Sequence, residues 1–191
     1  HSTMKVLKFG GSSVAKPERI RRIGDILKNY YSNGERFTVV FSAFGGVTDM
    51  LIEMSELAAA GDVAYQEVFE TFSKRHFEAI HELLNEPFLS QAMPELEMNH
   101  DVLKNLLYGI FLVREASPRT MDYVLSFGER NSAYIISHFL RQQGINASYL
   151  DARKIVKTDK NFGTATVDFD LTYKKILKHY SQNPEVQIVT G

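Results

Sequence analysis

The sequence predicts an α/β fold in which a mainly parallel sheet lies between layers of helices. Short apolar segments that suit strands alternate with longer segments whose apolar residues recur at helical spacing. The segment 37–42 (FTVVFS) is apolar almost throughout, which is typical of a strand covered on both faces. Twice near the N-terminus a strand ends in paired glycines before a helix, at 10–11 and at 45–46. In a parallel sheet both glycine turns should lie at the same edge, where such folds bind ligands.

The composition narrows the class of protein. The chain has 191 residues, of which 44% are hydrophobic, enough for one domain or slightly more. The net charge of -1 gives no electrostatic case for nucleic acid or an anionic membrane as a partner. The chain has no cysteine, which excludes disulfides and thiolate metal sites, and the histidines are expected to be isolated surface or half-buried residues. Without a long apolar run or a signal-peptide pattern, we expect a cytoplasmic protein.

The N-terminal third is expected to hold two strands and two helices. The first strand is predicted at 5–9 and the second at 37–42. A helix with a proline in its first turn follows the first strand and ends at an Asn-Gly pair, over residues 16–34. A second helix is predicted from Met50 to about residue 60. Residues 1–3, before the methionine, are interpreted as a remnant of cloning.

The segment 62–143 is expected to be largely helical. Breaks in the helical pattern are predicted at Pro87 and Pro94, with Asn99 capping the helix after the second break. A capping serine followed by proline predicts a further helix, or pair of helices, over 117–143.

The C-terminal part is expected to return to the sheet. Strands are predicted at 147–150 and 186–190. Between them we expect a loop or small hairpin over 151–167 and a helix around 171–180.

The first glycine turn has the chemistry of an anion site. Gly10 and Gly11 let the backbone approach a ligand, and the N–H groups of the turn and of the next helix can point at a phosphate. Lys8 stands just before them as a cation. The order of residues differs from that of a P-loop, whose lysine follows the glycines, and no third glycine completes a dinucleotide fingerprint. From these residues alone, a phosphate site and a plain glycine turn beside a surface lysine are equally supported.

Three motifs, in order, resemble those of the aspartokinases, in the amino acid kinase superfamily. The first is Lys8-Phe9-Gly10-Gly11-Ser12-Ser13-Val14, which is similar to the family's Lys-Phe-Gly-Gly-Thr-Ser-Val. Serine in place of threonine keeps the hydroxyl. The resemblance implies that Lys8 is catalytic and that Lys8, Phe9, Gly10, Gly11 and Ser12 bind the phosphates of ATP.

The second motif, FSAFGGVTD, follows the second strand. It resembles the family's stretch whose serine and threonine line the aspartate pocket, which implies this role for Ser42 and Thr48. Phe44 is bulkier than the small residues often found at its position, so the shape of the turn is open. Without the resemblance, Thr48 would be interpreted as the N-cap of the helix that begins at Met50.

The third motif, SFGERNS, lies within the helical segment. It resembles the family's Ser-x-Gly-Glu-x-x-Ser, whose glutamate holds the α-amino group of the substrate, and this implies that role for Glu129. Asn131 stands where leucine or methionine is usual. The alternative is an exposed helix glutamate, which is what most glutamates are.

The resemblance implies an enzyme that uses ATP to phosphorylate the β-carboxylate of L-aspartate, giving 4-phospho-L-aspartate. This is the first step toward lysine, threonine and methionine. The nucleophile is a carboxylate, which is ionised at neutral pH and needs no general base. Catalysis would then rest on positioning and on neutralising two anions. Mg²⁺ is expected to arrive with ATP, and no metal site is predicted on the protein itself.

The resemblance covers 4–191 and implies the N-terminal part of a catalytic domain, hence an incomplete amino acid kinase (carbamate kinase-like) fold. In the family, the ligands of the substrate α-carboxylate and most of the ATP site come later in the chain. The 191 residues alone are therefore expected to be inactive. An exposed sheet edge can pair with a second copy of the chain, so a homo-oligomer is an open alternative. The alternatives are a related kinase acting on glutamate, acetylglutamate or UMP, and a binding module without catalysis.

Overall fold

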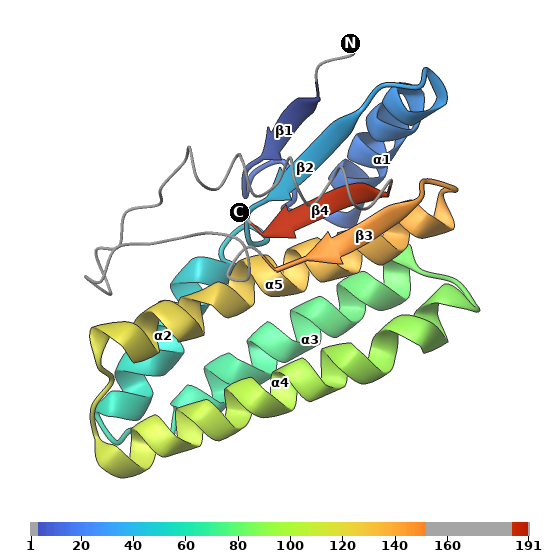
Figure 1. The fold of residues 1–191 in the computed structure, drawn as a ribbon. Helices are drawn as coiled ribbons and strands as arrows, with labels where there is room; N and C mark the ends of the chain where they lie inside the picture. Colours follow the sequence, from blue (N-terminus) through green and yellow to red (C-terminus); the bar gives the residue numbers. More distant parts are fainter. Residues whose placement is uncertain (1–3, 152–184, 191) are drawn as a thin grey trace.

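The computed structural model describes residues 4–151 and 185–190, and the fold of these residues is shown in Figure 1. Nine elements follow one another in this part of the chain. They are β1 (Lys5–Phe9), α1 (Pro17–Ser32), β2 (Phe37–Phe41), α2 (Val47–Ala59), α3 (Tyr65–Leu83), α4 (Phe88–Val113), α5 (Pro118–Gln142), β3 (Ala147–Leu150) and β4 (Val186–Thr190). In these residues no helix is both long enough and apolar enough to cross a membrane.

The sheet has the strand order β1-β2-β4-β3, and all three pairings are parallel. This confirms the predicted α/β class. The connections from β1 to β2 and from β2 to β3 advance across the sheet in the same direction, so right-handed crossovers place their helices on the same face. Figure 1 shows α5 running along that face, with α3 and α4 forming the layer beyond it.

The pleat of the strands divides the buried side chains between the two faces of the sheet. On the helical face, Phe37, Val39 and Phe41 of β2 join one large core with the apolar sides of the helices. On the opposite face, Val40 packs with Met4, Leu150 and Val189 in a small second cluster. β4, which has a strand on either side, is buried at all five positions.

Most predicted elements agree with the structure to within a residue or two. α1 begins at Pro17, and α5 is a single helix whose Ser117 hydroxyl accepts a hydrogen bond from the Thr120 N–H at 3.1 Å. α2 begins at Val47, three residues before the predicted Met50. The loop predicted over 151–167 and the helix predicted around 171–180 lie outside the described residues, apart from Asp151.

The break predicted at Pro94 is wrong, and Asn99 caps no helix. Pro94 lies inside α4, which runs without interruption from Phe88 to Val113. Proline in a helix costs about 3 kcal/mol. Tertiary packing offsets this cost, because the buried side of the helix continues through the proline at helical spacing. These buried positions are Ala92, Leu96, His100, Leu103, Leu107 and Ile110.

Candidate active site

The carboxyl ends of three strands meet at one edge of the sheet. In the β1–β2 register, Lys8 lies beside Val40 and Phe9 beside Phe41. The N–H of Ser42 extends this ladder by donating to the carbonyl oxygen of Phe9 at 3.1 Å. On the other side of β2, Phe41 pairs with Thr190 of β4. The predicted site residues of the first two motifs therefore lie at one edge, as parallel strands require.

The two glycine turns contact each other, and the approach is tightest at Gly45, where it favours glycine. A Cβ atom added at Gly45 would lie 3.2 Å from the Gly11 carbonyl oxygen and 3.2 Å from the Cβ of Ala15. A Cβ atom at Gly11 would lie 3.4 Å from the Ala43 carbonyl oxygen. Gly46 adopts a φ of 83°, in the left-handed region where only glycine is unstrained. The paired glycines thus serve close approach as well as turn formation.

The backbone of these turns leaves several donors available. Among the described residues, the N–H groups of Gly10, Gly11 and Gly46 have no hydrogen-bond acceptor, whereas Ser13 donates back to the Gly10 carbonyl at 3.0 Å. Gly10 and Gly46 are exposed, and Gly11 is half-buried. Unpaired N–H groups at a strand-to-helix turn can bind an anion. The structure is therefore compatible with the phosphate interpretation of the first motif.

The residues around the first turn differ in what they can contribute. Lys8 is exposed near the end of β1, next to the turn. Phe9 is stacked on Phe41 with ring centroids 5.5 Å apart, so its side chain belongs to the core and only its backbone can take part in a phosphate site. Ser12 is exposed, and its carbonyl oxygen accepts a hydrogen bond from Arg19 of α1.

The structure contradicts the alternative role for Thr48. Thr48 lies in the first turn of α2, whereas the N-cap is Gly46, which has no side chain to make a capping hydrogen bond. Thr48 is exposed, and its hydroxyl has no partner among the described residues. The side chain is therefore available at the rim of the second glycine turn, on the same edge as Ser42.

Phe44 does not occupy the glycine turn. Its ring is 3% exposed and stacks on His76 of α3, with ring centroids 5.3 Å apart. The large side chain points into the helical layer and leaves the turn to backbone atoms. The size of Phe44, which left the shape of the turn open in the sequence, therefore does not intrude on the turn.

Helix α5 brings Glu129 to the second turn. The hydroxyl of Ser132 donates to the Ser42 carbonyl at 2.6 Å. One residue before Glu129, a Cβ atom at Gly128 would lie 2.8 Å from the Cβ of Ala43, so the helix lies directly against the turn. These two contacts place the part of α5 that carries Glu129 beside the end of β2.

Glu129 is half-buried rather than a fully exposed helix glutamate. Burial raises the pKa of its carboxyl to about 7, while a hydrogen bond from its own backbone N–H acts in the opposite direction. A carboxylate that burial makes costly to ionise gains most from a cationic ligand, such as an ammonium group. The structure is compatible with the role implied for Glu129.

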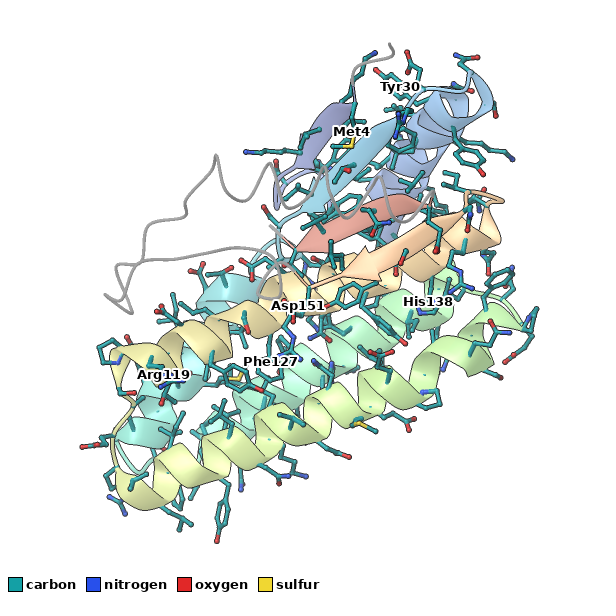
Figure 2. The ribbon with its side chains drawn as sticks, in the orientation of Figure 1. Met4, Tyr30, Arg119, Phe127, His138 and Asp151 are labelled. Carbon is teal, nitrogen blue, oxygen red and sulfur yellow. The ribbon has the colours of Figure 1, made fainter. Side chains whose placement is uncertain are left out.

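Two arginines at this edge were not anticipated. Arg75 of α3 donates to the backbone carbonyl of Gly45 in the second glycine turn and to that of Ala15, in the segment that follows the first. Arg130 lies over the ring of Phe127, 4.5 Å from its centroid. Its Nε lies 3.6 Å from Oδ2 of Asp151, a residue that Figure 2 labels at the end of β3. The partners of Arg75, and Asp151 as the partner of Arg130, are distant in sequence, so spacing gave no signal for these contacts. Only the position of Arg130 next to Glu129 could have drawn attention to it.

The prediction of isolated histidines on or near the surface is wrong for His76 and His100. Both are buried in the helical layer, with ring centroids 5.8 Å apart. His100 forms hydrogen bonds with Asn131 at 2.7 Å and with Ser73 at 2.8 Å. Asn131 thus replaces an apolar packing residue with a polar one that has partners. Within residues 4–151 and 185–190, no group of three or more His, Cys, Asp or Glu side chains could hold a metal ion.

Comparison with known proteins gives one family. The model of the amino acid kinase family matches residues 3–191. Aspartokinase 1, chloroplastic, of Arabidopsis thaliana is 33% identical over 193 residues, which cover 97% of this chain and 32% of that protein. The bifunctional aspartokinase/homoserine dehydrogenase 2, chloroplastic, of the same plant is 30% identical, over 97% of this chain and 20% of its own length.

Solved structures give the same result. Escherichia coli aspartokinase III in complex with aspartate and ADP superposes with a TM-score of 0.82 at 26% identity, over 99% of this chain and 40% of that one. Its complex with lysine and aspartate gives a TM-score of 0.84 at 26% identity, over 98% of this chain and 40% of that one. The chain therefore spans about a fifth to two fifths of the relatives that it matches.

Proposed function

This chain belongs to the amino acid kinase family, and from this we propose that it is the aspartate-binding part of an aspartate kinase. The full-length protein would transfer the γ-phosphoryl group of ATP to the β-carboxylate of L-aspartate, giving 4-phospho-L-aspartate and ADP. The proposal is supported by the resemblance to aspartokinases over nearly the whole chain. In the E. coli relative, aspartate and ADP are bound together.

One observation carries the mechanism: the two glycine turns contact each other and present unpaired N–H groups at one edge of the sheet. The proposed reaction brings a phosphate group and a carboxylate together, and both are anions. Donors that are already oriented can stabilise this charge without reorganising during the reaction. We assign the amides of Gly10 and Gly11 to the phosphoryl oxygens and the ammonium of Lys8 to neutralisation of the charge. Ser12 completes the phosphate side of the site.

The acceptor would be held from the other side. Glu129 binds the α-ammonium group of aspartate, and Ser42 and Thr48 supply neutral hydrogen-bonding groups around the substrate. The contact of Ser132 with Ser42 and the close packing of Gly128 on Ala43 support this placement, because they fix α5 against the second turn. The β-carboxylate attacks phosphorus directly and no proton is removed, so the absence of a proposed general base follows from the chemistry.

The proposed metal requirement follows from the nucleotide. Mg²⁺ would be bound by the phosphates of ATP and neutralise part of their charge. The described residues offer no cluster of three or more acidic or histidine side chains for a separate ion. We assign no protein ligand to it.

The test is ADP release by the full-length protein, measured with ATP, Mg²⁺ and one acceptor at a time. Aspartate should support turnover at about 1–100 per second, as is typical of kinases, and glutamate, acetylglutamate and UMP should not. Turnover with another acceptor would assign the protein to a different kinase of the family. The proposal would be contradicted if aspartate neither supported turnover nor protected the protein against thermal unfolding. The 191 residues alone are proposed to be inactive, which the same assay checks.

A further inference from the structure

One side chain of the helical layer joins the second glycine turn to the segment that follows the first. Arg75 lies in the middle of α3, outside all three motifs. Its Nη2 donates to the carbonyl oxygen of Ala15, in the segment that follows the first turn, at 3.2 Å. Its Nη1 donates to the carbonyl oxygen of Gly45 in the second turn. A single planar guanidinium thus holds both segments from behind.

No described residue of the protein balances the charge of Arg75. Among the described residues, no carboxylate lies within ion-pair distance of its guanidinium. The side chain is partly buried, and this burial lowers its pKa. Arginine nevertheless keeps its proton in proteins, so a positive charge lies directly behind the unpaired amides. Such an arrangement suits a site whose ligands are both anions.

The hydrogen bond to Gly45 also orients a donor. In a trans peptide the C=O and N–H groups point in opposite directions. When Arg75 holds the carbonyl of Gly45, the N–H of Gly46 in the same peptide unit must point away from the helical layer. This N–H has no acceptor among the described residues. A bond to a charged donor polarises the peptide and makes its N–H a stronger donor.

We propose that Arg75 is a positioning residue for phosphoryl transfer: it fixes the distance between the two glycine turns and aims the Gly46 N–H at the group that is transferred. Arg75 acts through the backbone and does not itself touch a substrate. The inference rests on the proposed function, because it places the phosphoryl group that moves from ATP to aspartate at the exposed edge that the two turns share. It adds a residue of the helical layer to a site otherwise built from the sheet edge and α5.

The test compares variants of the full-length protein at saturating ATP and aspartate. Arg75→Ala should lower kcat by about 10²-fold, the loss that a misplacement of about 1 Å produces, while the KM values change by less than about threefold. Arg75→Lys, which can reach only one of the carbonyls, should lie between. Arg21→Ala is the matched control: Arg21 of α1 also donates to a backbone carbonyl of another element, that of Glu82 in α3 at 3.0 Å, but neither carbonyl held by Arg75 is its partner. Its kcat should stay near that of the wild type.

Free guanidinium distinguishes positioning from folding. At millimolar concentration it should restore part of the kcat of Arg75→Ala and none of any activity lost in Arg21→Ala. Two results would overturn the inference and leave the proposed function intact. One is a kcat of Arg75→Ala within threefold of wild type. The other is a loss of kcat in both Arg75 variants that guanidinium does not rescue and that parallels the loss of folded protein. A wild-type protein without aspartate-dependent ADP release would overturn the proposed function first, and the inference with it.

Discussion

The hydroxyl of Ser132 donates a hydrogen bond to the carbonyl oxygen of Ser42 at 2.6 Å, and this contact fastens α5 to the end of β2. Ser132→Ala should leave that carbonyl without its donor and raise the KM for aspartate more than the KM for ATP, since Glu129 lies on the same helix. Ser137→Ala is the control, because Ser137 is a buried serine of α5 that donates within its own helix, to Tyr134 at 2.7 Å. Steady-state kinetics check the prediction. It would be contradicted if both variants changed the KM for aspartate equally.

Lys8→Ala should lower kcat by about 10²–10³-fold, as expected for the loss of a donor that stabilises charge in the transition state. Lys5→Ala removes a lysine from the same strand, which pairs with Glu35 at 3.1 Å, and should leave kcat unchanged. The measurement is ADP release at saturating substrates. Near wild-type turnover in Lys8→Ala would remove this residue from the mechanism.

Glu129→Gln should weaken aspartate binding by about ten- to a hundred-fold, because a hydrogen bond to a charged group contributes about 1.5–3 kcal/mol. Binding of ATP should change little. Ser42→Ala and Thr48→Ala should act in the same direction more weakly, since their hydroxyl groups carry no charge. Isothermal titration of each ligand gives the comparison. Equal losses for aspartate and ATP would show that Glu129 is structural.

The raised pKa of Glu129, about 7, predicts a pH dependence. Aspartate should bind more tightly as the pH rises through 7, because only the ionised carboxylate attracts the ammonium group. Without ligand the sign is opposite: the folded state prefers the protonated carboxyl, so this residue costs stability as the pH rises from its ordinary pKa toward 7. As the pH rises over this range, the melting temperature of Glu129→Gln should therefore increase relative to that of the wild type. A constant difference would show that the carboxyl is not perturbed.

Gly128→Ala should destabilise the fold by about 1–3 kcal/mol, the usual cost of overpacking, because the new Cβ would lie 2.8 Å from that of Ala43 and 3.3 Å from Leu51. Gly109→Ala, also within a helix, meets no atom within 4 Å and should stabilise by up to about 1 kcal/mol through helix propensity. Chemical denaturation measures both. Similar effects at the two positions would contradict the close packing of α5 on the second turn.

The parts of the fold that sequence could predict are those fixed by local patterns. β2 and the Pro17 start of α1 follow from apolar spacing and from the backbone preferences of single residues. Pro94 misled the prediction because the outcome depends on what the other side of α4 packs against, which no local pattern contains.

The candidate site divides in the same way. Lys8 and the glycines belong to motifs that are contiguous in sequence. Arg75 meets Ala15 and Gly45 only through the fold, and His76 meets His100 only because α3 lies against α4. Contacts between distant residues depend on how the helices are arranged around the sheet. Neither composition nor spacing reports that arrangement.

The position of β4 in the sheet has a consequence for synthesis of the protein. β4 lies between β2 and β3, yet it follows both in the chain, so that Val39 pairs with Ile188. On the ribosome, the helices and the first three strands emerge while the slot between β2 and β3 is still unfilled. Contacts so distant in sequence form slowly, and the unfilled slot exposes strand edges that invite wrong pairing. We therefore expect the nascent chain to remain a substrate for chaperones until the residues of β4 have left the exit tunnel.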